Sequence, residues 1–152
     1  MYPIKQLYKL YCLFFYKLVR FVLRLDQIFG SMSMEWVMHR AFFALYIVQM
    51  IWFFTLVKVI EIIIGKEMPY FFDDQLMDAT LLFAIISIFN YFILIYKKRW
   101  FKYDQEFASY SKIKNQIINI SILTFYIFSF ALFVIIFIIW GNLWDAGEIK
   151  EF

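Results

Sequence analysis

Three long apolar runs constrain this chain more than any other feature of its sequence. They cover residues 41–64, 76–96 and 117–140, and each is long enough to cross a hydrocarbon core, which takes about 20 helical residues. Backbone polar groups inside a bilayer must be satisfied within the segment itself, so such runs form helices. The hydrophobic fraction of 64% is also far above that of ordinary soluble domains. We therefore predict an all-α membrane protein with three transmembrane helices.

The distribution of cations predicts the orientation of these spans. Of the fifteen Lys and Arg residues, six precede the first span and six lie between the second and the third. Lys and Arg in short loops resist translocation, so both regions are expected on the cytoplasmic side. Seven of the twelve acidic residues fall on the opposite side, in the loop after the first span, at the boundary of the second span (Asp78) and in the tail after the third. We expect a cytoplasmic N-terminus and an external C-terminus.

The N-terminal segment, residues 1–30, is apolar but is interrupted by cations at regular spacing. On a helical wheel five of them fall within an arc of roughly 120°, and apolar side chains cover most of the remainder. A spanning helix would bury two of them near its middle at about 2.5 to 3.5 kcal/mol each. No small-residue cleavage site follows, so a signal peptide is not expected. The five cations are Lys5, Lys9, Lys17, Arg20 and Arg24.

This pattern predicts an N-terminal amphipathic helix that lies in the membrane interface. Its five cations are the predicted membrane-surface contact, because each basic side chain near an anionic leaflet contributes about 1 kcal/mol. The partner is then a bilayer with anionic headgroups, and the helix also helps to set the orientation. The alternative is that the basic face binds a specific anionic partner or lipid. Residues 31–152 form the three-span membrane domain.

Two sets of side chains are candidates for a helix-packing or partner face. Helix association in lipid depends on small and polar residues, which recur at helical spacing in the second span. In the loop that follows, aromatic residues fall on one helical stripe. The residues are Thr80, Ala84, Ser87 and Asn90 in the span, and Trp100, Tyr103, Phe107 and Tyr110 in the loop.

The second span is expected to continue as a helix past the membrane surface and to turn back near Ser111. Its aromatic stripe must be covered either by the N-terminal helix, which is the simpler assumption, or by a partner protein. We expect Asn90 to make an interhelical hydrogen bond rather than to bind a ligand.

Apart from Asp78 at the outer boundary of the second span, charged residues within the spans are confined to Lys58 and Glu61 in the first one. Both lie near the outer end of that span, where a lysine stem can reach the headgroups and pair with a carboxylate three residues on. We interpret them as a snorkelling surface pair. A functional intramembrane ion pair is the alternative.

Residue patterns that would carry chemistry are missing from the sequence. It has one His and one Cys, and it lacks glycine-rich phosphate loops, nucleophile elbows and metalloprotease motifs. Glu35 and His39 stand four residues apart, but no third metal ligand is evident. Aromatic residues among the cations are explained by the nearby membrane rather than by nucleic acid. We expect no enzyme activity, no catalytic residues, no cofactor or metal site and no nucleic-acid partner.

The second half of the chain carries a family resemblance. The stretch "FNYFILIYKKRWFKYDQEFASYSKIKNQIINISILTFYIFSFALFVI", residues 89–135, resembles a group of small, uncharacterised multi-pass inner-membrane proteins of Bacteroidetes. In that group a span ending in N-Y-F is followed by Y-K-K-R, a short charged loop with S-K, and a final span containing Y-I-x-S-F. The first half is similar through "YKL" and "EWVMHRAFFALYIVQM". The resemblance implies the inner (cytoplasmic) membrane of a bacterium, and it brings no activity and no functional residues.

Two candidate packing faces without any accompanying chemistry favour a structural role. Our hypothesis is a non-enzymatic scaffold or accessory subunit of a membrane complex, with a protein partner or a homo-oligomer. The alternative is an oligomeric channel or membrane-disrupting effector that assembles around polar positions such as Asn90, Asn119 and Ser121.

Overall fold

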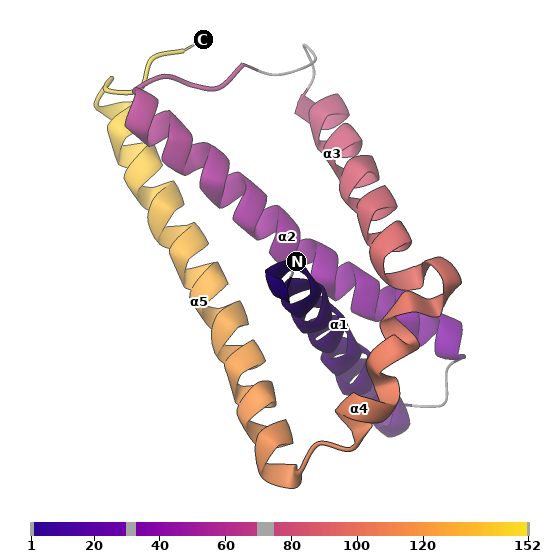
Figure 1. Ribbon diagram of the computed structural model, residues 1–152. Coiled ribbons are helices and arrows are strands. Elements are labelled where there is room, and N and C mark those ends of the chain that lie inside the picture. The colour runs from indigo at the N-terminus through magenta and orange to yellow at the C-terminus, as the bar shows by residue number, and fades with distance from the viewer. Residues whose placement is uncertain (1, 30–32, 70–74, 152) are drawn as a thin grey trace. The chain divides into compact units, whose positions relative to one another are not determined.

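The computed structural model describes residues 2–29, 33–69 and 75–151, and within them it contains helices and no strand (Figure 1). The long helices are α1 (Tyr2–Phe29), α2 (Met34–Ile64), α3 (Gln75–Asn90) and α5 (Lys112–Asp145). A π-helix, η1 (Tyr91–Ile95), a 3-10 helix, η2 (Tyr96–Tyr103), and the short α4 (Asp104–Ala108) connect α3 to α5. The all-α prediction is confirmed.

Within the described residues, three segments are long and apolar enough to cross a membrane, namely Met34–Ile64, Met77–Ile95 and Lys112–Asp145. They coincide with the three predicted spans. The 31 residues of α2 and the 34 residues of α5 rise roughly 45 to 50 Å, which exceeds a hydrocarbon core of about 30 Å. Both helices therefore continue several residues beyond the apolar region.

The chain groups into two compact units. Unit 1 consists of Met1–Tyr46 and Ile86–Ile122, and unit 2 of Ile47–Ile85 and Leu123–Phe152. Unit 1 contains α1, η1, η2 and α4 together with one end of each long span, and Phe15, Val19 and Phe107 are among its buried side chains. Unit 2 contains the other ends of the spans and the C-terminal tail.

The second span does not continue as one regular helix, which corrects the prediction. Hydrogen bonding widens to the π pattern over Tyr91–Ile95, the backbone leaves the helical region at Tyr96 with ψ 123°, and Lys97 has φ +54°. A positive φ costs a residue with a Cβ on the order of 1 kcal/mol. The aromatic stripe does have helical spacing, but its packing against α1, described below, outweighs the local preference for an unbroken helix.

The start of α2 follows from local sequence. Ser33 immediately precedes the helix, its carbonyl oxygen accepts the Val37 N–H at 3.3 Å, and Glu35 lies in the first turn. Serine is a preferred residue before a helix, and a carboxylate near the N-terminus interacts favourably with the helix dipole.

Candidate functional site

Unit 1 is organised around the contact between α1 and the aromatic stripe that follows η1. The rings of Phe15 and Trp100 meet edge to face with centroids 5.8 Å apart, and those of Tyr16 and Phe107 are 5.4 Å apart. Trp100 is 4% exposed and Phe107 is 1% exposed. Aromatic pairs in such geometry contribute about 0.5 to 1.5 kcal/mol beyond the burial of their area. The prediction that α1 covers this stripe is therefore confirmed for these two rings.

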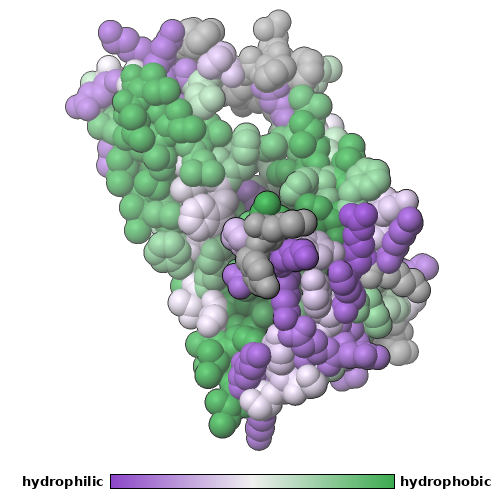
Figure 2. Space-filling view, in the orientation of Figure 1, coloured by the Kyte–Doolittle hydropathy of each residue, from purple (hydrophilic) through white to green (hydrophobic). Residues whose placement is uncertain are grey.

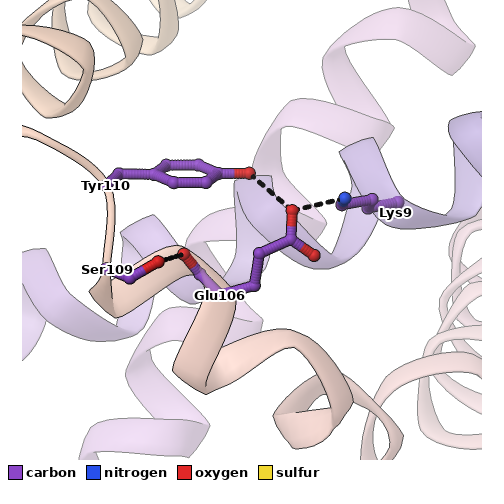
Figure 3. Close-up of polar contacts among 4 residues, drawn as sticks. All are labelled: Lys9, Glu106, Ser109 and Tyr110. Carbon is purple, nitrogen blue, oxygen red and sulfur yellow. Dashed lines mark hydrogen bonds and ion pairs between the residues drawn. The ribbon is translucent and has the colours of Figure 1, made fainter.

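A polar cluster beside the aromatic contact fixes the register of α1 (Figure 3). The Lys9 ammonium donates to the Glu106 carboxylate at 2.5 Å, the Tyr110 hydroxyl donates to the same oxygen at 3.3 Å, and the Ser109 hydroxyl donates to the Glu106 carbonyl at 2.8 Å. The hydrogen bond from Lys9 lowers the pKa of Glu106, and Glu106 in turn raises the pKa of Lys9. Since the pair is exposed, it supplies orientation more than stability.

The cations predicted to contact the membrane surface divide into two groups. Lys9 contacts Glu106, Lys17 donates to the Asn115 amide oxygen at 2.5 Å, and Arg20 donates to the Tyr16 hydroxyl at 3.2 Å. Arg20 also lies 4.0 Å from Asp104. Burial lowers the pKa of Lys17. The structure therefore places three of the five cations against the protein.

The other two, Lys5 and Arg24, are exposed on α1. Neither has a hydrogen bond or an ion pair to the described part of the chain. Contact of any of the five with lipid remains a prediction.

Two tyrosines join α1 to the end of the second span. The Tyr11 hydroxyl donates to the side-chain oxygen of Asn90, which is completely buried, and the Tyr8 hydroxyl donates to the Ile93 carbonyl at 3.4 Å. Burial, reinforced by the neighbouring Cys12, raises the pKa of Tyr8 to about 12. The predicted interhelical hydrogen bond of Asn90 is confirmed, with α1 as its partner helix.

The remaining residues of the predicted packing face lie in different surroundings. Thr80 and Ala84 are exposed on α3, whereas the Ser87 hydroxyl is buried without a hydrogen-bond partner in the described residues. In the loop, Tyr103 and Tyr110 are half-buried beside Phe107. The two predicted faces thus contain both exposed and buried side chains, and their contact with a partner stays a prediction.

Unit 2 contains a buried charge cluster at the end of α2. Lys58 donates to Glu61 at 2.8 Å, and its ammonium lies 3.7 Å from the centroid of the Trp140 ring. The other carboxylate oxygen of Glu61 accepts the Met68 N–H at 3.1 Å. The predicted pairing is confirmed, but the Lys58 and Glu61 side chains are only 14% and 3% exposed, so the pair is covered by the chain rather than lying on its surface. Sequence spacing identified the pair but gave no sign of Trp140 or Met68.

A short backbone contact holds the C-terminal tail in the same unit. The Glu67 N–H donates to the Lys150 carbonyl at 2.9 Å, and the Lys150 N–H donates to the Gly65 carbonyl at 3.1 Å. Ile149, the residue before Lys150, is buried. Sequence reasoning missed this contact because a single bridge has no periodicity to detect.

Side chains that could hold a metal ion are not brought together in the part of the chain that the structure describes. Glu35 and His39 are exposed, and the described residues contain no group of three or more His, Cys, Asp or Glu able to hold a metal ion. The acidic residues Asp73 and Asp74 lie outside the described residues. No protein-family model, no curated protein and no solved structure matches this chain.

Proposed function

We propose that this chain is a non-enzymatic scaffold or accessory subunit of a membrane complex in the inner membrane of a bacterium. Its three long apolar helices are compatible with an integral membrane protein. The observation that carries the proposal is the exposure of small residues on α3, where Thr80 and Ala84 lie about one helical turn apart.

Lipid supplies no hydrophobic driving force between helices, because acyl chains are as apolar as Leu. Association therefore depends on close approach of backbones and on interhelical hydrogen bonds. Small exposed side chains such as Ala84 permit the close approach. Only 11% of the most apolar stretch of the Met77–Ile95 span is buried within the chain, which leaves this face available to another helix.

A site-specific photo-crosslinker tests the proposal in cells. Placed at Ala84, it is expected to give adducts, and placed at Phe89, an exposed position on the opposite side of α3, it is expected to give none. An adduct of twice the chain mass of 18.7 kDa identifies a second copy, and any other mass identifies a partner protein. Absence of adducts at Ala84, together with a monomer in mild detergent, would contradict the proposal.

The proposed orientation places the N-terminus in the cytoplasm and the C-terminus outside. Its support is the position of the cations, since the region before the first span and the loop between the second and third hold twelve of the fifteen Lys and Arg residues. In this orientation α1, η2 and α4 lie on the cytoplasmic side.

The alternative function, a channel or membrane-disrupting effector, is favoured by the polar residues Asn119 and Ser121, which are exposed at the cytoplasmic end of α5 in the proposed orientation. An oligomer could bring such residues around a conducting path. Ion flux across vesicles that contain the purified protein distinguishes the two functions. Leakage that Asn119→Leu abolishes would favour the channel, and vesicles that stay sealed would favour the scaffold.

A further inference from the structure

Docking on the aromatic stripe leaves a large apolar part of α1 exposed. One side of the helix, which includes Cys12, Phe15 and Val19, is buried, and the five cations occupy a second side. A third side spans an arc of about 120° at 100° per residue and carries apolar side chains that are 40 to 75% exposed. These are Ile4, Leu7, Leu10, Phe21, Leu25 and Ile28. Leu18, midway along this side, is buried, so the exposed side chains form two patches, one at each end of α1.

The contacts of α1 fix the depth at which the first patch lies. Tyr8 and Tyr11 donate hydrogen bonds to Ile93 and Asn90, and both acceptors belong to the membrane-spanning segment Met77–Ile95. Ile4, Leu7 and Leu10 are within about one helical turn of these tyrosines. A surface held against the end of a span faces the boundary of headgroups and acyl chains rather than bulk water.

Exposed charge flanking the apolar side indicates the kind of lipid. Lys5 and Arg24 lie about 100° around the helix from Ile4 and Leu25, and their long stems can reach headgroups from there while the apolar side is inserted. Both cations are exposed and lack an ion pair to the described residues. Figure 2 shows hydrophilic side chains gathered over unit 1 around α1 and the helices that follow α3. Each basic side chain close to an anionic leaflet adds favourable energy, whereas zwitterionic headgroups offer no net charge.

We propose that the two apolar patches of α1 insert into the leaflet of the membrane that the spans cross, while Lys5 and Arg24 contact anionic headgroups. The helix is then an in-plane element of the kind that buries its apolar side shallowly below the headgroups. Lys9, Lys17 and Arg20 instead hold α1 on the protein. Six large apolar side chains in water would be an aggregation hazard, and insertion removes it. This inference is independent of the scaffold role.

Spin labels on the full chain in vesicles test the insertion. Single cysteines replace Leu10 and Phe21 in the patches, and Gln6 and Gln27, exposed on the basic side, are the matched controls. The native Cys12 is completely buried. Labelling of the unsubstituted chain serves as the control for any spin label that Cys12 takes up. Labels at Leu10 and Phe21 are expected to be accessible to oxygen and protected from a water-soluble nickel chelate, with the reverse at the control positions.

Two results would overturn the insertion. Accessibility of the patch labels to the nickel chelate would place them in water. Protection from both reagents with an immobilised spectrum would place them against protein.

The headgroup contact has its own test. Spin-labelled phosphatidylglycerol is expected to be immobilised by the native chain more than labelled phosphatidylcholine. In the double variant Lys5→Gln, Arg24→Gln, the ratio of immobilised phosphatidylglycerol to immobilised phosphatidylcholine should fall by about fivefold for each cation removed. Lys150→Gln, a substitution at an exposed position in the tail, should leave the ratio unchanged. Equal preference in the native chain and the double variant would show that these two cations do not contact anionic lipid.

Discussion

The ammonium of Lys58 and the carboxylate of Glu61 form an ion pair 2.8 Å apart that the protein buries at the end of α2. The Trp140 ring from α5 lies against the cation, and the Met68 N–H occupies the second carboxylate oxygen. Burying two charges costs several kcal/mol each unless they are paired and hydrogen-bonded. The surrounding groups meet that requirement, and the pair thereby ties parts of unit 2 that are distant in sequence.

Removing one member of this pair should destabilise the protein strongly. Glu61→Leu leaves Lys58 buried without a counter-charge, and we expect a loss of about 3 to 5 kcal/mol, measured as thermal unfolding in detergent. The double variant Lys58→Met, Glu61→Leu should recover most of the loss, because no charge remains buried. Glu151→Leu, at an exposed position, is the control. If Glu61→Leu has the same unfolding temperature as the native chain, the pair is not part of the stable structure.

The aromatic contact of α1 can be followed through the single cysteine of the chain. Cys12 is completely buried in unit 1, and burial raises the pKa of its thiol, so it should react slowly with a maleimide. Phe107→Ala should cost about 3 to 5 kcal/mol, loosen α1 and speed the reaction. Phe101→Ala, at a half-exposed ring in the same segment, should leave the rate nearly unchanged. Equal rates in the two variants would argue against the docked arrangement.

Acid should weaken the docking of α1 through Glu106. Its pKa is lowered by Lys9, so the ion pair contributes fully above the ordinary carboxyl pKa of about 4.3. The contribution is lost as the pH falls through the lowered value. The pKa of Lys9 is raised, so its contribution to docking depends on pH in the opposite direction. That contribution is lost only as the pH rises above the ordinary lysine pKa of about 10.4. The pair therefore favours docking between these limits.

The measurement is the reaction rate of Cys12 with a pyridyl disulfide, taken as the ratio between the native chain and Lys9→Met at each pH. We expect the native chain to be better protected at neutral pH and the difference to vanish in acid. A constant ratio from neutral to acid pH would show that Glu106 and Lys9 do not hold the helix.

The tail contact in unit 2 depends on a glycine. Gly65 has φ +67°, and a Cβ placed there would lie 3.4 Å from the Glu148 carbonyl oxygen. Gly65→Ala should therefore destabilise the protein by about 1 to 2 kcal/mol, because the left-handed conformation is strained for alanine. Gly141→Ala, in a helix with no atom near the new methyl group, should be neutral or stabilising by up to about 1 kcal/mol. The unfolding temperature should fall in Gly65→Ala and should stay the same or rise in Gly141→Ala. Equal shifts in the two variants would contradict the left-handed conformation of Gly65.

The orientation is testable with an impermeant thiol reagent on intact cells. Ser111 and Glu148 are both exposed and lie outside the apolar parts of the spans. A cysteine at Glu148 should react from outside, and one at Ser111 should react only after the membrane is permeabilised. The reverse pattern would invert the proposed topology.

Some features of the site follow from spacing along the chain. The polarity of Asn90 inside a span predicted a hydrogen bond between helices, and the three- and four-residue spacing of Trp100, Tyr103 and Phe107 predicted a buried aromatic stripe. Both are present. Spacing gave no means to foresee that Tyr11 is the partner of Asn90 or that Trp140 covers Lys58, because each pair joins residues roughly eighty positions apart.

The sequence by itself determined that this chain has three apolar helices and an N-terminal helix interrupted by cations, since helix length and side-chain periodicity are local properties. The tertiary structure alone decided how the charged groups are used. It placed Lys9, Lys17 and Arg20 against protein groups, buried the pair of Lys58 and Glu61, and broke the helix at Lys97. The physical reason is that the energy of a charge depends on its solvent exposure and on partners that folding brings together, and neither is encoded in the spacing of neighbouring residues.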